Sequence, residues 1–287
     1  MKKLTLILAV TTITLAAISC GHKKTQSNEE AQKEEPNKTL VLYYSLTGNT
    51  KAVAQEIATR LNADMEEIVA VDPYDPDFET TINRCLKERE EGTVTKIQPI
   101  AADLSKYDVI CIGYPVWFGT FAPPVATFLD SYDLSGKTVV PFCTFGSGGL
   151  PSSIKDLAQR QPNARIIGGY GVRAARLAAM PQEVEQFLIG NHFIEGEYIQ
   201  LGDFSDLQPV NDEEASIFAA ATGNYEPKLN AIPELVGSRA IPDGIEYLYI
   251  AKDLPRKDMP NMPPAGEMKV YVTVLDGQEP VFTQVVR

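Results

Sequence analysis

Short apolar runs alternate with amphipathic segments over residues 39–191. Runs rich in Val, Ile, Leu or aromatic residues predict five strands, at 39–45, 65–70, 107–113, 137–143 and 164–169. Apolar residues at helical spacing predict helices at 49–61, 77–91, 121–131, 150–160 and 181–189. Strands that alternate with helices build a parallel sheet covered on both faces. With right-handed crossovers, the pattern predicts a three-layer α/β domain around a five-stranded, doubly wound parallel sheet.

The alternation stops after residue 191, and a different pattern fills residues 205–287. One helix is predicted at 212–222. Strands are predicted at 229–236, 246–251, 269–275 and 281–286. The last two are joined by a hairpin loop at 276–280, and the proline-rich residues 255–267 predict an exposed loop. This half of the chain therefore predicts a small α+β domain of one helix and four antiparallel strands.

The chain begins with a segment that is not expected to belong to either domain. Residues 1–20 start with two lysines, continue with an apolar stretch and end at Cys20. The apolar stretch is too short to span a membrane comfortably and is typical of a secretory signal. Small residues before a lone cysteine resemble the lipobox of bacterial lipoproteins, although Leu15 lies further upstream than usual. The resemblance implies that Cys20 is lipidated, and a plain secretory signal with an incidental cysteine remains the alternative.

Residues 21–38 are rich in Lys, Glu, Gln, Ser and Asn and contain no large apolar side chain. Such a segment cannot bury enough apolar surface to fold, so we expect a disordered tether. Together with the lipidated cysteine, it predicts an exported protein that is anchored in the cell envelope by its N-terminus. The sequence does not say which membrane holds the anchor.

Charge and cysteine content argue against two classes of protein, those that bind nucleic acid and those that bind a metal through cysteines. The chain has 26 basic and 38 acidic residues, a net charge of −12, which argues against nucleic acid as a partner. Besides Cys20 the cysteines are Cys85, Cys111 and Cys143, and their spacing matches no metal site. We interpret all three as buried thiols, with a Cys111–Cys143 disulfide as the alternative that export would allow.

The first predicted strand runs into a polar loop that precedes the first helix. The loop consists of Ser45, Leu46, Thr47, Gly48, Asn49 and Thr50. Hydroxyl groups, a glycine and the free amides of a helix N-terminus are suited to binding a phosphate. The loop lacks the lysine ending of a P-loop and the glycine spacing of a dinucleotide site. The alternative is an ordinary polar turn that is capped by Asn49.

Two further loops follow the third and fourth predicted strands, at the same edge of the sheet. The first contains Pro115, Val116, Trp117, Phe118 and Gly119. The second contains Thr144, Phe145, Gly146, Ser147, Gly148 and Gly149. A solvent-facing apolar loop with the only tryptophan of the chain favours a flat aromatic ligand. As alternatives, Trp117, Phe118 and Phe145 could instead belong to the core.

The three loops, in this order, resemble the flavin mononucleotide (FMN) loops of the flavodoxin family. The resemblance covers residues 39–191 and extends to the flavodoxin-like proteins of bacterial envelopes. It implies that loop 45–50 binds the FMN phosphate, that 115–119 line one face of the ring with Trp117 against it, and that 144–149 hold the pyrimidine edge. The peptide between Phe118 and Gly119 is our candidate for stabilising the one-electron-reduced flavin.

The resemblance implies an electron carrier, or an oxidoreductase of the NAD(P)H or quinone reductase type. Its partner would be a redox protein or a small-molecule electron donor or acceptor. The other hypothesis is a non-redox binding lipoprotein that no longer holds FMN. Absorbance of the purified protein separates the two.

No acid–base constellation is evident. His192 is expected at the surface, and Arg173 and Arg176 either reach the rim of the site or are solvated charges. Residues 205–287 resemble the cystatin-like fold, but residues 239–244 do not match the inhibitor loop of cystatins. We therefore expect a binding or docking role for the second domain rather than protease inhibition.

Overall fold

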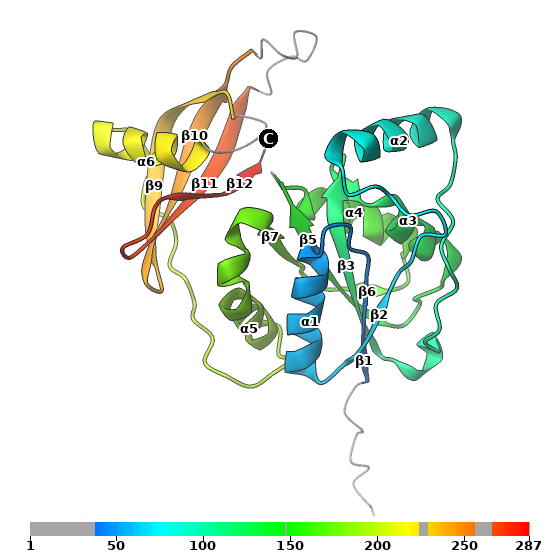
Figure 1. The fold of residues 1–287 in the computed structure, drawn as a ribbon. Coiled ribbons are helices and arrows are strands. Elements are labelled where there is room, and N and C mark those ends of the chain that lie inside the picture. The colour runs from blue at the N-terminus through cyan, green and yellow to red at the C-terminus, as the bar shows by residue number, and fades with distance from the viewer. Residues whose placement is uncertain (1–37, 147, 224–228, 256–265, 287) are drawn as a thin grey trace, which may run out of the picture. The chain divides into compact units, whose positions relative to one another are not determined.

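The computed structural model describes residues 38–146, 148–223, 229–255 and 266–286 (Figure 1). The predicted signal segment with Cys20, the tether up to residue 37, Ser147 and most of the proline-rich loop lie outside the described residues. Within the described ranges, no helix has both the length and the apolar character that crossing a membrane requires.

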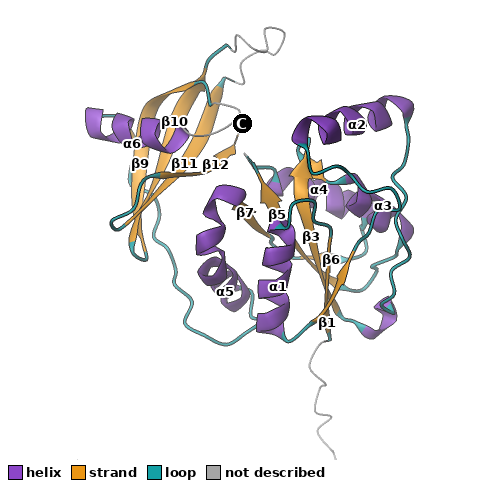
Figure 2. Cartoon of the chain, viewed as in Figure 1, coloured by secondary structure: helices purple, strands orange, loops and turns teal. Residues whose placement is uncertain are grey.

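A parallel sheet forms the centre of the first domain (Figure 2). Its main strands are β1 (Thr39–Tyr43), β2 (Asp64–Glu67), β3 (Val109–Trp117), β5 (Thr138–Phe145), β6 (Arg165–Ile166) and β7 (Tyr170–Arg173). The order is β2-β1-β3-β5, and both β6 and β7 pair with β5. The winding direction reverses between β1 and β3, which pair in parallel from Thr39↔Val109 to Tyr43↔Gly113. The predicted doubly wound α/β fold is confirmed.

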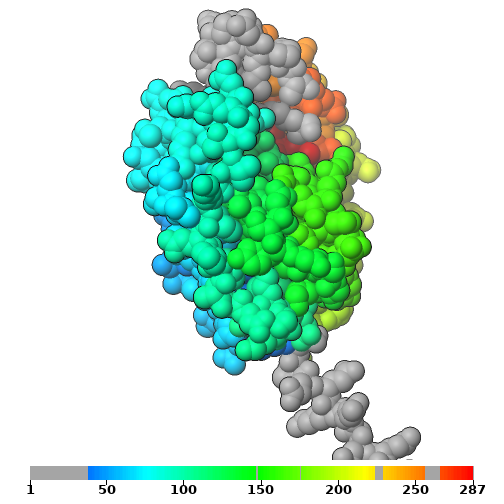
Figure 3. Space-filling model, turned by 90° about the vertical axis from the view of Figure 1, so that its right-hand side faces the viewer, coloured from blue at the N-terminus to red at the C-terminus, as the bar shows by residue number. Residues whose placement is uncertain are grey.

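Helices cover both faces of this sheet. They are α1 (Asn49–Leu61), α2 (Phe78–Glu91), α3 (Pro123–Ser131), α4 (Leu150–Arg160) and α5 (Met180–Gly190), with 3-10 turns at Leu104–Lys106 and Ala174–Ala179. Alternate side chains of β1 face opposite sides of the sheet and belong to two separate hydrophobic cores. Leu40 and Leu42 pack with residues of α3 and α4, whereas Val41 and Tyr43 pack with residues of α1 and α5. Because successive side chains of a strand point to opposite faces, helices pack on both faces of the sheet and the domain has three layers. The helices α2, α3 and α4 lie at the surface coloured cyan to green in Figure 3.

Two strands differ from the prediction. The third strand was predicted to end at residue 113, but β3 continues to Trp117 because it folds back on β4 (Thr120–Phe121). The turn consists of Phe118 and Gly119, both with positive φ (51° and 82°), as in a two-residue type I′ hairpin. The fifth strand was predicted at 164–169, but this span contains only β6, and the longer β7 begins at Tyr170, after Gly168 and Gly169.

The second domain has one helix and an antiparallel sheet. Its elements are β8 (Gln208–Pro209), α6 (Asp212–Gly223), β9 (Ala231–Ile241), β10 (Gly244–Asp253), β11 (Glu267–Leu275) and β12 (Val281–Val286). The strand order β12-β11-β10-β9-β8 adds a short strand to the four that were predicted. Asn211 and Glu214 form a reciprocal capping box at the start of α6. The ring centroids of Phe218 in α6 and Tyr249 in β10 lie 5.1 Å apart, so the helix covers one face of the sheet.

Candidate functional site

The loop after β1 leaves the start of α1 without a side-chain cap. Gly48 is the N-cap residue, with φ 90°, and Asn49 is the first residue of the helix. The alternative of a turn capped by Asn49 is therefore wrong. Ser45 Oγ accepts a hydrogen bond from the amide of Lys51 at 3.2 Å, which folds the loop over the first helical turn. With the Lys51 amide engaged, the start of α1 offers the amides of Asn49 and Thr50 and a favourable dipole to an anion.

Thr50 points into the protein rather than toward solvent. Its side chain is 1% exposed, and its Oγ1 lies 2.8 Å from Oγ1 of Thr144, which is 4% exposed. The two hydroxyls hydrogen-bond across the edge of the sheet and join the loop after β1 to the end of β5. The sequence placed both residues at the site but did not predict that they bind each other.

The indole of Trp117 is supported by two buried tyrosines. Its ring centroid lies 5.9 Å from Tyr44 and 5.2 Å from Tyr74, with interplanar angles of 89° and 73°. The tyrosines are 6% and 4% exposed, whereas Trp117 is only partly buried. Trp117 is thus attached to the core and still reaches the surface. Burial raises the pKa of Tyr44 to about 12, so its phenol is neutral.

The loops after β3 and β5 touch each other. Ser152 Oγ donates a hydrogen bond to the Gly119 carbonyl at 2.5 Å. A Cβ on Gly149 would lie 2.5 Å from Cγ1 of Val116, so this position requires glycine. With the Thr50–Thr144 bond and the Tyr44–Trp117 contact, each of the three loops contacts the other two.

The remaining predicted residues occupy different depths around this junction. Phe145 is 7% exposed and belongs to the core, whereas Phe118 is 49% exposed and does not. Leu46, Val116 and Trp117 pack partly against the same core. Thr47, Gly48, Gly119 and Gly146 are exposed, and Asn49, Pro115, Gly148 and Gly149 are half-buried.

The two arginines and the three cysteines that the sequence singled out are engaged or buried. Arg173 donates from Nε to the Gly146 carbonyl at 2.7 Å and thus reaches the loop after β5, whereas Arg176 pairs with Glu183 at 2.6 Å. His192 is exposed, as predicted. Among the described residues, no group of His, Cys, Asp and Glu could hold a metal. Cys85, Cys111 and Cys143 are free and buried, so the disulfide alternative is wrong.

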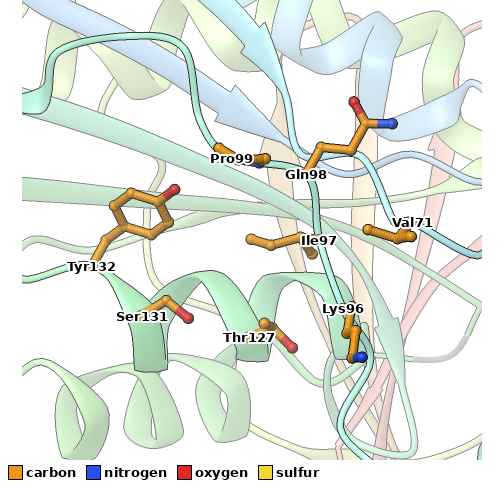
Figure 4. Close-up of a pocket in the computed structure, with 8 residues that line it drawn as sticks. All are labelled: Val71, Lys96, Ile97, Gln98, Pro99, Thr127, Ser131 and Tyr132. Atoms are coloured by element: carbon orange, nitrogen blue, oxygen red, sulfur yellow. The ribbon is translucent and has the colours of Figure 1, made fainter.

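A surface groove of about 550 Å³ lies elsewhere on the domain (Figure 4). It is lined by residues 71 and 96–99 on one side and, on the other, by Thr127 and Ser131 of α3 and by Tyr132, which follows the helix. None of the predicted ligand-binding residues lines it. Tyr132 uses its hydroxyl to accept from the amide of Ile100, and Thr127 donates to the Thr95 carbonyl. These polar groups therefore stabilise the chain that forms the groove.

The strand order and the three loops at the carboxyl ends of β1, β3 and β5 define a flavodoxin-like α/β domain. Residues 38–179 match the family model described as Flavodoxin, and this part of the chain is a domain of that family. The second domain lies outside the match.

Similar proteins include an NAD(P)H dehydrogenase (quinone) of Cupriavidus metallidurans, 32% identical over 101 residues. That match covers 33% of this chain and 46% of the relative, so the chain spans about half the length of this relative. A flavoprotein from Lactobacillus acidophilus, solved in complex with FMN, is 28% identical with a TM-score of 0.41 and covers 50% of this chain and 98% of its own. A candidate flavoprotein from Bacteroides eggerthii is 28% identical with a TM-score of 0.47, covering 53% and 96%.

Proposed function

We propose that the flavodoxin-family domain binds FMN between its three loops and transfers electrons. The observation that carries this proposal is the mutual contact of the three loops, through Thr50 with Thr144, Tyr44 with Trp117, and Val116 with Gly149. These contacts bring a phosphate-type helix N-terminus, a partly exposed indole and a glycine-rich turn to one edge of the sheet. This is the switch point at which doubly wound folds bind ligands.

The residues present fit the parts of FMN. The amides at the start of α1, the hydroxyl of Thr47 and the nearby ammonium of Lys51 bind the phosphate, because they combine donors, dipole and positive charge. Trp117 offers a flat surface to the ring. The backbone of residues 144–149 holds the polar edge of the ring, and glycines there allow close approach. Arg173 supports this loop through the Gly146 carbonyl.

Bound FMN supplies one-electron or hydride transfer, and the protein orients it and tunes its environment. The site residues include no acid–base pair, so the protein's contribution is binding and electrostatics. The turn residues Phe118 and Gly119 place a peptide beside Trp117, and Ser152 holds the Gly119 carbonyl. Gly119 tolerates either sign of φ, so the peptide before it can rotate and present its carbonyl or its amide to the ring.

We further propose that this activity belongs to the cell envelope, and two features of the sequence support it. Residues 1–20 with Cys20 form a lipoprotein signal, and residues 21–38 tether the folded domains to the membrane. The donor or acceptor is then a redox protein or a small molecule that reaches that compartment. The second domain serves to dock a partner.

FMN and riboflavin titrations test the binding proposal. The purified protein, or protein incubated with FMN, should show the visible absorption of a bound flavin. Thr47→Ala should weaken FMN binding about 10- to 150-fold, because hydrogen bonds to charged groups are worth about 1.5–3 kcal/mol, and should leave riboflavin binding unchanged. Ser135→Ala is the control, since Ser135 is exposed and precedes the amino end of β5, whereas the loop 144–149 lies at the carboxyl end of that strand. A protein that stays colourless after incubation with FMN would support the non-redox binding lipoprotein instead.

A second measurement separates a carrier from a reductase. Under anaerobic conditions, NADPH alone should bleach the bound flavin of a reductase within the assay. A carrier would remain oxidised until a reducing partner protein is added. Fractionation of cells, together with Cys20→Ser, tests the anchor, since the variant should leave the membrane fraction.

A further inference from the structure

Tyr74 lies behind Trp117 and is fixed at several points. It comes from the segment between β2 and α2, far from β3 in sequence, and is 4% exposed. Its ring packs against the indole with centroids 5.2 Å apart and planes at 73°. An edge-to-face pair of this kind contributes about 0.5–1.5 kcal/mol beyond burial and defines the relative orientation of the rings.

The hydroxyl of Tyr74 is bound by two side chains. It donates to Glu88 Oε2 of α2 at 2.5 Å and lies 2.6 Å from Oγ1 of Thr95. Burial and the hydrogen bond to Glu88 raise the pKa of Tyr74, so the phenol remains protonated. A protonated phenol held by a carboxylate fixes the hydroxyl end of the ring and keeps the ring from sliding along the core.

Arg84 holds the face of the same ring. Its guanidinium carbon lies 4.0 Å from the Tyr74 ring centroid, and its Nε donates to Glu88 Oε1 at 2.8 Å. It also donates to the Pro73 carbonyl at 2.8 Å and pairs with Asp72 at 3.1 Å. The cation, the carboxylate and the phenol therefore form one network, and α2 carries two of its three members.

Simple packing does not require this network. A phenylalanine would fill the space beside Trp117 without the cost of burying a hydroxyl and a carboxylate oxygen. A satisfied polar network restricts the core to one arrangement, which apolar contact alone does not do. Because the indole is half-exposed at the edge of the loops, its orientation would otherwise depend on the hairpin turn and on Tyr44 alone.

We infer that Tyr74 is a positioning residue: the network of Tyr74, Glu88 and Arg84 sets the orientation in which Trp117 meets the planar ring of the ligand. The inference rests on the proposed function for the identity of that ring. Its effect on the indole is independent of any ligand. Helix α2 thereby acts on the site through the aromatic pair without touching the ligand.

The apoprotein permits a direct test, because Trp117 is the only tryptophan of the chain. We expect Tyr74→Phe and Glu88→Ala to shift the emission of Trp117 to longer wavelength and to increase its quenching by acrylamide. Glu88→Gln keeps one acceptor oxygen for two donors, Tyr74 Oη and Arg84 Nε, and should therefore give a shift between those of the wild type and Glu88→Ala. Tyr170→Phe is the matched control, since Tyr170 donates to Glu183 at 2.8 Å and packs on the opposite face of the sheet.

The affinity of the protein for flavins is the second measurement. Tyr74→Phe should weaken FMN and riboflavin binding by the same factor, about three- to tenfold, because the loss of about one hydrogen bond affects the ring and not the phosphate. Circular dichroism verifies folding, and Glu88→Ala replaces Tyr74→Phe if the latter does not fold.

Unchanged Trp117 fluorescence in both folded variants would overturn the inference, as would an equal change in Tyr170→Phe. If the wild type binds no FMN, the proposed function fails, and the fluorescence of the apoprotein still decides whether Tyr74 positions Trp117. The two ideas can thus fail separately.

Discussion

The hydrogen bond between Thr50 and Thr144 offers a sharp test of the loop junction. The two hydroxyls are 1% and 4% exposed and 2.8 Å apart. Replacing one threonine with valine keeps the volume but leaves the other hydroxyl buried without this partner. An unsatisfied buried polar group costs about 1–3 kcal/mol, whereas replacing both partners by apolar groups of the same shape is close to neutral.

The expected pattern is a double-mutant cycle with a positive coupling. Thr50→Val and Thr144→Val should each lower the free energy of unfolding by about 1–3 kcal/mol, and the double variant should lose about 1 kcal/mol or less. The coupling energy, which is the sum of the two single losses minus the loss of the double variant, is then at least about 1 kcal/mol, and residues in direct contact typically show about 0.5–3 kcal/mol. Thr47→Val, at an exposed position of the same loop, should change stability by less than about 0.5 kcal/mol.

Urea unfolding followed by the fluorescence of Trp117 measures these values. Trp117 lies in the flavodoxin-family domain, so the signal reports this domain and not the second one. A double variant that loses the sum of the two single losses would refute the reasoning. That result would mean that the hydroxyls do not depend on each other and that the loops are not joined at this point.

Three other outcomes follow from the structure. Gly149→Ala should lose about 1–3 kcal/mol of stability, because its new Cβ meets Cγ1 of Val116 and φ is 117°, while Gly146→Ala, with nothing within 4 Å, should be near neutral in the same urea assay. Burial raises the pKa of Glu183 above its ordinary value of 4.5, so this group stabilises the fold below that pH and loses its contribution as pH rises through the folded-state pKa. The unfolding free energy of the wild type relative to Glu183→Gln should therefore fall between acidic and neutral pH, and a flat difference would contradict this. An alkylating reagent should modify Cys85, Cys111 and Cys143 only after unfolding, because burial shields these thiols and raises their pKa. Mass spectrometry of the native and the unfolded protein measures this.

Periodicity predicted most of the fold, because the patterns that it reads are local. Helix α1 has the predicted bounds, 49–61, since its apolar residues at 53, 54, 57 and 58 all face the core. The division of the fifth strand and the extra strand β8 were not predicted, because short strands depend on their neighbours for pairing. The continuation of β3 to Trp117 was missed for the same reason: its partner β4 has only two residues.

The position of the site was contained in the sequence, since parallel strands bring the loops after β1, β3 and β5 to one edge. Patterns of residue type also indicated a phosphate loop and an aromatic loop. They could not show which hydroxyl of the loop is exposed and which is buried. Thr47 is exposed and Thr50 is buried, and this difference arises from the direction of α1 and from Thr144, 94 residues further along the chain.

The chain by itself therefore determined the order of its elements, the sheet and the loops that meet at its edge, because hydrophobic period and turn chemistry act over a few residues. The tertiary structure alone decided how those loops are held: the bond from Thr50 to Thr144, the glycine beside Val116, and the tyrosine that supports Trp117. Each is a contact between residues distant in sequence, and such contacts exist only once the layers have packed.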